Sequence, residues 1–137
     1  MKHQKIPLLE EAFKKAMLAR NRAHAPYSNF KVGAVIKLAG IDKLYSGCNV
    51  ENASFGATVC AERVAIFSAI ASKGKVPFEY MLLVTDMNPC AVPCGICLQV
   101  IAEFTYPEFP IYLSNLTGVQ EKVMLGDLLP RGFTSFT

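Results

Sequence analysis

The chain has 137 residues, of which 52% are hydrophobic and 18% charged, and its formal net charge is +3 at pH 7. This length predicts a single domain, residues 1–137, with a hydrophobic core of its own. The small and mixed charge argues against a nucleic-acid-binding protein, which would concentrate basic residues on one face. The high hydrophobic fraction indicates that other subunits cover part of the surface.

No apolar run reaches the roughly 18 residues of a membrane span, which argues against membrane insertion. Residues 1–10 are charged and lack the apolar centre of a signal peptide, so we expect a cytoplasmic protein. The chain has five cysteines, which should stay free in a reducing compartment. A Cys-x-x-Cys motif there indicates metal or redox chemistry rather than a structural disulfide.

Helical and strand patterns alternate along the chain. Leu9, Ala12, Phe13 and Ala16 recur at the spacing of one helix face, whereas the apolar run EYMLLVTD is typical of a strand buried on both faces. In order, we expect a helix from 8 to about 21–24, strands over 31–38 and 43–50, a helix over 60–72, a strand over 79–86, a helix over 94–105, strands over 111–113 and 121–125, and one helical turn at 127–129. The antiparallel first hairpin and the helical crossovers predict a mixed five-stranded sheet with helices on both faces, a three-layer α/β/α sandwich.

The most informative motifs are CAE at 60–62 and PCGIC at 93–97, each at the start of an expected helix. Unsatisfied N–H groups and partial positive charge at a helix N-terminus stabilise the thiolate, the form that binds metal. Three thiolates are one ligand short of a closed tetrahedral zinc site, and the fourth position is left for water in catalytic zinc sites. We therefore expect one Zn²⁺ per chain, held by Cys60, Cys94 and Cys97.

Glu62 lies two residues after the first cysteine, where a carboxylate can act as general acid and base for that water. Zn²⁺ with three thiolates has a net negative charge, which makes it a poor activator of water unless charge is withdrawn from sulfur. Arg63 is the candidate for this compensation, because its guanidinium can donate hydrogen bonds to thiolates. The spacing is similar to the signature of zinc deaminases, in which histidine stands at the position of Cys60.

Other interpretations of the cysteines stay open at this point. Cys90 could complete a structural four-cysteine zinc site, or the thiols could be buried core residues that hold no metal. Cys48 and Cys90 are otherwise expected to be small buried or loop residues, and His3 and His24 to face solvent.

Five ordered motifs resemble the small, homotetrameric class of cytidine deaminases, zinc enzymes of pyrimidine salvage that act on free nucleosides. The motifs are PYSNFKVGA at 26–34, GCNVENASF at 47–55, CAER at 60–63, PCGICLQ at 93–99, and LLP at 128–130 followed by Phe133. The resemblance runs over about residues 8–133 and implies the cytidine deaminase fold. It identifies Cys60, Cys94 and Cys97 as the zinc ligands and Glu62 as the proton shuttle.

The same resemblance assigns substrate-binding residues. Asn49 and Glu51 match the residues that hydrogen-bond the ribose hydroxyls, a role that suits an amide and a carboxylate two residues apart on one strand face. Phe30 matches the aromatic residue that packs on the pyrimidine, and the backbone N–H of Ala61 would help to hold the base. Phe133 resembles the C-terminal aromatic residue that each subunit contributes to a neighbour's site.

Two positions depart from the family pattern. Leu98 stands where the family usually has a second arginine, so charge compensation of the thiolates would rest on Arg63. Val92 replaces the usual small hydroxyl residue before the PCGIC motif, which would loosen substrate hydrogen bonding in that loop.

The expected function is zinc-dependent hydrolytic deamination of cytidine and deoxycytidine to uridine and deoxyuridine. One alternative is a deaminase of another small aminopyrimidine nucleoside, such as blasticidin S, against which the Asn49–Glu51 pair argues. A polynucleotide-editing deaminase would need a basic path and stacking aromatics, and this chain has no tryptophan and little net charge. A non-catalytic zinc-binding interaction module is disfavoured by the missing fourth ligand and by Glu62.

Overall fold

The computed structural model describes residues 5–136, so His3 lies outside the described residues. The elements, in chain order, are α1 (Leu9–Asn21), β1 (Gly33–Leu38), β2 (Leu44–Cys48), the 3-10 helix η1 (Phe55–Ala57), α2 (Ala61–Lys73), β3 (Phe78–Val84), α3 (Gly95–Phe104), β4 (Pro110–Asn115), β5 (Gly118–Met124) and α4 (Leu125–Leu128). The predicted order of helices and strands is confirmed, and η1 is a short addition within a predicted loop.

The strand boundaries differ from the prediction by up to three residues, and two of the differences have identifiable reasons. β5 begins at Gly118 rather than at 121, because a tight turn closed by the Asn115 side chain returns the chain directly into the sheet. β2 ends at Cys48 rather than at 50, because Val50 leaves β1 and forms bridges with Val59 and with His24. Asn49 and Glu51 therefore follow the strand instead of lying on it.

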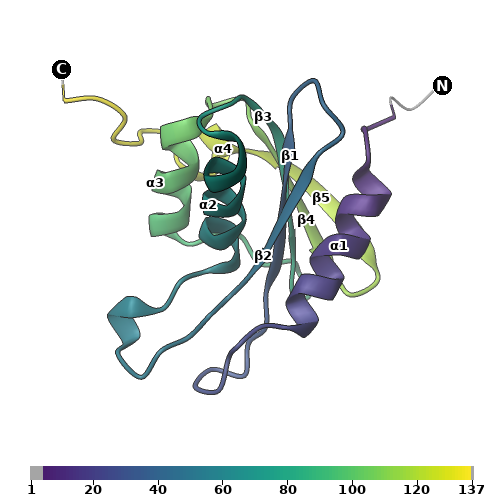
Figure 1. Ribbon diagram of the computed structural model, residues 1–137, viewed down its shortest axis with the longest axis vertical. Coiled ribbons are helices and arrows are strands. Elements are labelled where there is room, and N and C mark those ends of the chain that lie inside the picture. The colour runs from purple at the N-terminus through teal and green to yellow at the C-terminus, as the bar shows by residue number, and fades with distance from the viewer. Residues whose placement is uncertain (1–4, 137) are drawn as a thin grey trace.

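The sheet has five strands in the order β2-β1-β3-β4-β5. Only the β3–β4 pair is parallel, with Met81 opposite Ile111, and the other three pairs are antiparallel. Figure 1 shows α1 on one side of this sheet and α2 and α3 on the other. The predicted mixed sheet and three-layer α/β/α sandwich are thus confirmed.

One face of the sheet packs against α1 through very small residues. Ala12 and Ala16 are fully buried against Val35 and Leu82. Gly33 allows the closest approach, since a Cβ atom on this residue would lie 2.0 Å from the carbonyl oxygen of Ala16. The alanine stripe of the predicted first helix is therefore its packing face.

The opposite face carries the larger part of the core, between the sheet and α2 and α3. Ile66 of α2 and Ile101 of α3 are fully buried there, together with Ile36 and Leu83 of the sheet. Burying side chains of this kind stabilises the fold by about 1.5–3 kcal/mol each. This packing places α2 and α3 on the same face of the sheet.

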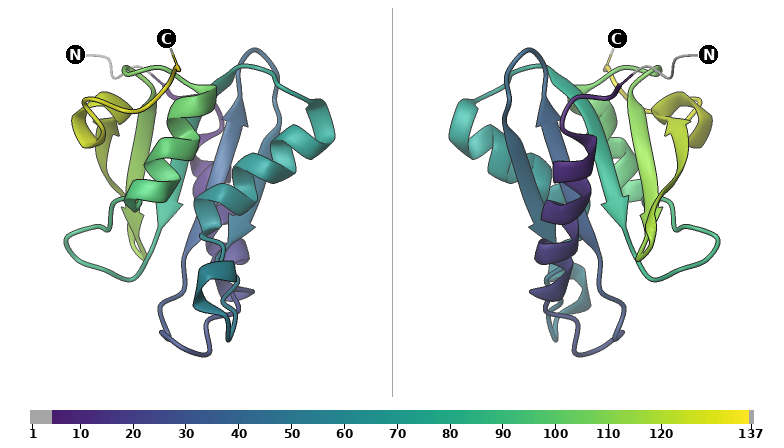
Figure 2. Two further views of the ribbon diagram at one scale, coloured as in Figure 1. Left: turned by 90° about the vertical axis from the view of Figure 1, so that its left-hand side faces the viewer. Right: turned by 90° about the vertical axis from the view of Figure 1, so that its right-hand side faces the viewer.

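The loops that precede β1 and α2 project together beyond one end of the sheet (Figure 2). Within the described residues, no helix has the length and apolar character needed to cross a membrane.

Candidate functional site

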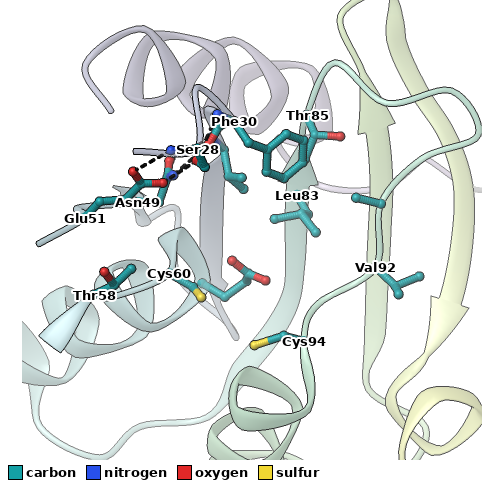
Figure 3. Close-up of a pocket in the computed structure, with 13 residues that line it drawn as sticks. Ser28, Phe30, Asn49, Glu51, Thr58, Cys60, Leu83, Thr85, Val92 and Cys94 are labelled. Atoms are coloured by element: carbon teal, nitrogen blue, oxygen red, sulfur yellow. Dashed lines mark hydrogen bonds between the residues drawn. The ribbon is translucent and has the colours of Figure 1, made fainter. Parts of the chain in front are cut away.

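A cavity of about 240 Å³ lies where α2 and α3 begin, beside the carboxyl end of β3. Ligands of open α/β sheets commonly bind in this position, outside the carboxyl ends of the strands. The lining residues come from five stretches of the chain and are Ser28, Phe30, Val32, Asn49, Glu51, Thr58, Cys60, Glu62, Leu83, Thr85, Ala91, Val92 and Cys94. Figure 3 shows these side chains arranged around one space, which has the size for a small molecule.

Three cysteine side chains converge at this cavity. The Sγ atoms of Cys60, Cys94 and Cys97 all lie within 4.8 Å of one another. Cys60 and Cys94 are the N-cap residues of α2 and α3, and both have an extended backbone conformation. Each is thus the last loop residue before its helix begins. Within residues 5–136, no fourth cysteine, histidine or carboxylate joins this cluster, and Cys90 lies outside it.

The donor set fits a zinc ion with one open position. Tetrahedral zinc with Zn–S bonds of about 2.3 Å holds sulfur atoms about 3.8 Å apart, so only a small closing movement of the side chains is needed. Cys94 is exposed, whereas Cys97 is buried, so the cluster lies at the boundary between core and cavity.

The thiols differ in their proton affinity. The hydrogen bond from Cys97 lowers the pKa of Cys60 to about 5, and hydrogen bonds from Arg63 and Cys94 act in the same direction. The pKa of Cys97 is raised, because its thiol proton is held in the hydrogen bond to Cys60 and because the group is buried. The hydrogen bond between these two thiols thus favours the thiolate on Cys60 and the proton on Cys97, and metal binding would require Cys97 to release that proton.

Glu62 is the second residue of α2 and its side chain lines the same cavity. It is only 5% exposed, and burial raises its pKa to about 7, with a further contribution from the negative charge of Cys60. The three sulfur atoms form their cluster without it, so the carboxyl group lies in the cavity beside the candidate metal ligands and is not one of them.

Arg63 lies beside the cysteine cluster. Its Nη2 donates to Cys60 Sγ at 3.7 Å and to the Thr58 carbonyl oxygen at 3.4 Å. Its Nε is buried and has no hydrogen-bond partner among the described residues. Leu98, at the position of the usual second arginine, is 7% exposed and packs into the core, so it offers the thiolates no donor.

Asn49 is buried and connects two neighbouring backbone groups of the loop before β1. Its Oδ1 accepts a hydrogen bond from the Val32 N–H at 2.9 Å, and its Nδ2 donates to the Phe30 carbonyl oxygen at 2.8 Å. The Phe30 ring extends from this held backbone into the cavity, near Leu83 and Thr85 (Figure 3).

Glu51 holds the preceding part of the same loop. Its Oε1 accepts the backbone N–H groups of Tyr27 at 2.9 Å and Ser28 at 3.1 Å, and its Oε2 accepts the Ser28 hydroxyl. These bonds, the Ser28 hydroxyl first, lower the pKa of Glu51, so its carboxylate is ionised at neutral pH. Both expected ribose-binding residues thus also fix the loop that carries Phe30.

Two of the predicted residues are not among those that line the cavity of their own chain. Ala61 is fully buried at the start of α2 and is not among the residues that line the cavity. Phe133 is 61% exposed in the C-terminal segment, also away from the cavity lining. The Gln99 side chain holds it there, since its amide nitrogen donates to the Phe133 carbonyl oxygen and its Oε1 accepts the Phe133 N–H at 3.2 Å.

Several lining residues were not predicted from the sequence, among them Ser28, Thr58, Leu83 and Thr85. Thr85 is fully buried and directly follows β3, and a polar residue after a buried parallel strand was a usable signal. Ser28 lies within the PYSNF motif, but its role depends on a contact with Glu51, 23 residues away in sequence.

The remaining cysteines and histidine behave as ordinary structural residues. Cys48 and Cys90 are free, half-buried thiols outside the cluster of three. His24 is exposed and takes part in the bridge to Val50.

Comparison with known proteins supports the chemistry of this donor set. The family model of the cytidine and deoxycytidylate deaminase zinc-binding region matches residues 7–113. Cytidine deaminase of Sporosarcina psychrophila is 42% identical over 126 residues, which cover 92% of this chain and 91% of that relative. A more distant relative, Blasticidin-S deaminase of Bacillus cereus, is 29% identical over 96% of this chain and 93% of its own length.

The fold has a similar counterpart among solved structures. The crystal structure of cytidine deaminase from Burkholderia pseudomallei superposes with a TM-score of 0.83 and 40% identity, over 97% of this chain and all of that one. Sequence, fold and cysteine cluster agree, and the chain therefore belongs to the cytidine and deoxycytidylate deaminase zinc-binding family.

Proposed function

We propose that this protein catalyses the hydrolytic deamination of cytidine and deoxycytidine to uridine and deoxyuridine, with release of ammonia. The observation that carries the proposal is the convergence of three thiols and a buried carboxyl group, Glu62, on one small cavity. Cys60, Cys94 and Cys97 would hold Zn²⁺, which, when bound, polarises a water molecule and lowers its pKa.

Glu62 is the proton carrier in this proposal. Its carboxylate takes a proton from the attacking water and delivers it to N3 of the pyrimidine as the C4–O bond forms. It then carries the proton of the new C4 hydroxyl to the amino group, the C4–N bond breaks, and ammonia leaves. General acid–base catalysis of this kind contributes about 10²–10⁴-fold to the rate.

The polar residues of the cavity favour a nucleoside. The Asn49 amide can donate and accept one further hydrogen bond each, and the Glu51 carboxylate has about one lone-pair site left after its three bonds. These free sites suit ribose hydroxyl groups, and the Phe30 ring offers an apolar surface for the base.

Charge in the cavity argues for a nucleoside over a nucleotide substrate. Among the described lining residues there is no lysine, arginine or histidine, while Glu51 and Glu62 are both present. A 5′-phosphate would meet carboxylates without a compensating cation. Deoxycytidylate is therefore the less favoured of the two substrates that the family description names.

We further propose a cytoplasmic homotetramer of pyrimidine salvage, as the family resemblance implies. Large apolar side chains such as Phe55, Phe133 and Phe136 are 73%, 61% and 96% exposed, which suits surfaces covered by other subunits. Phe133 would then enter a neighbouring subunit's site. A mass measurement in solution tests this assembly, and a stable active monomer would contradict the role of Phe133.

One assay tests the activity directly. Purified protein is mixed with cytidine, deoxycytidine or blasticidin S, the loss of ultraviolet absorbance is followed, and zinc is measured alongside. The proposal expects about one zinc per chain, turnover of the ordinary nucleosides, and loss of roughly 10²–10⁴-fold in kcat with unchanged zinc content in Glu62→Gln. Turnover of blasticidin S alone would favour the second candidate, which the similarity to Blasticidin-S deaminase supports.

A further inference from the structure

Ser28 has an unusual position in the cavity wall, because its hydroxyl group bonds to both halves of the proposed substrate site. The hydroxyl donates to Glu51 Oε2, and its oxygen accepts the N–H of Phe30 at 3.0 Å. In Figure 3 the dashed hydrogen bonds run from Glu51 through Ser28 to the backbone of Phe30. A hydroxyl has a single hydrogen, so donation to Glu51 fixes its orientation and leaves its lone pairs for Phe30.

The backbone between these residues has an uncommon conformation. Asn29, between Ser28 and Phe30, is left-handed with φ of 58°, a region that asparagine adopts more readily than other residues except glycine. On the far side of Phe30, Asn49 holds the carbonyl oxygen of Phe30 and the N–H of Val32. Ser28 holds the near side, and together these contacts determine where the Phe30 ring stands.

We propose that Ser28 is a positioning residue that couples the Glu51 carboxylate, at the sugar end of the cavity, to the Phe30 ring, at the base end. This inference rests on the proposed function, since it assigns Glu51 and Phe30 to the sugar and the base. Ser28 need not touch the reacting atoms. It links Glu51 to the backbone of Phe30 through hydrogen bonds. Correct placement of the sugar against Glu51 therefore also places the Phe30 ring, on which the base packs.

Three single variants test this coupling. Ser28→Ala removes both hydrogen bonds, Ser28→Thr keeps the hydroxyl group, and Ser54→Ala removes an exposed hydroxyl of the neighbouring loop that has no capping bond. Ser28→Ala should raise KM for cytidine roughly tenfold, because the lost bond involves a charged acceptor, and leave kcat within about twofold. Ser28→Thr should restore KM, and Ser54→Ala should match the unchanged protein.

A double-mutant cycle separates coupling from a local packing defect. If Ser28 acts through Glu51, the KM increase of Ser28→Ala should become smaller in a Glu51→Gln background, so that the two effects are less than additive. Fully additive effects, an equal loss of kcat and kcat/KM, or no rescue by Ser28→Thr would each overturn the proposal.

Hydrogen exchange tests, without any measurement of enzyme activity, the hydrogen-bond relay from Glu51 through the Ser28 hydroxyl to the Phe30 amide. Exchange of the segment 25–32, which contains the Phe30 amide, should be faster in Ser28→Ala than in the unchanged protein and in Ser54→Ala, because that amide loses its acceptor. If no nucleoside is turned over but this acceleration is seen, the proposed function fails while the relay stands. Unchanged exchange with normal turnover leaves the proposed function intact and overturns the relay.

Discussion

Gly47→Ala is the substitution whose effects on stability and on kcat follow most directly from the structure. Gly47 lies in β2 directly beneath the first turns of α2. A Cβ atom at this position would lie 2.5 Å from the Ala65 backbone nitrogen and 2.6 Å from the Ala61 carbonyl oxygen. Both contacts are with helix backbone, so no side-chain rotation can relieve them.

The helix would have to move away from the sheet. Restoring an ordinary contact of 3.4 Å to the Ala65 nitrogen, 2.5 Å away, requires α2 to move by about 0.9 Å. Overpacking of this kind costs about 3 kcal/mol, and an unfolding entropy of about 2.1 cal/mol/K per residue converts this to a decrease of roughly 10 °C in Tm. Because Glu62 directly follows Ala61, its carboxyl group moves with the helix, and a displacement near 1 Å costs up to about 100-fold in kcat.

Thermal unfolding followed by circular dichroism, together with kcat for cytidine, measures both effects. Gly56→Ala is the matched control, since a Cβ atom there meets nothing within 4 Å, and its stability should change by less than about 0.5 kcal/mol. If Gly47→Ala unfolded within about 2 °C of the control and kept its kcat, the argument from close helix–sheet contact would be refuted.

Three further predictions concern the metal site and the C-terminal segment. Arg63→Ala should lower zinc retention or kcat by about 10–100-fold, as loss of a residue that supports metal ligands usually does, and near-normal zinc content and turnover would contradict the assigned compensation. Removing zinc with a chelator should abolish turnover and lower Tm, and both should return on adding zinc; an unchanged Tm would argue against a site that binds only the folded chain. Gln99→Ala should speed trypsin cleavage after Arg131, because the contacts that hold Phe133 are lost. The exposed Glu103→Ala on the same helix should leave that rate unchanged.

Much of the architecture was predictable because it depends on local patterns. The apolar run of β3 and the alanine stripe of α1 both place their residues in the core as expected. The position of the cysteine motifs could also be predicted from the sequence. Each motif lies at the start of a helix, where neighbouring residues determine the backbone geometry. The end of β2 was not predictable, because it depends on bridges from Val50 to two distant segments.

The sequence by itself determined the fold class, the metal-binding residue types and the carboxyl group beside them, because spacing and helix starts are local properties of the chain. Only the tertiary structure decided how the site is held. Asn49 and Glu51 bind the loop of Phe30 through residues some 20 positions away, and Gln99 reaches Phe133 over 34 positions. Contacts over such separations depend on how the sheet and its loops pack, and no local pattern records them.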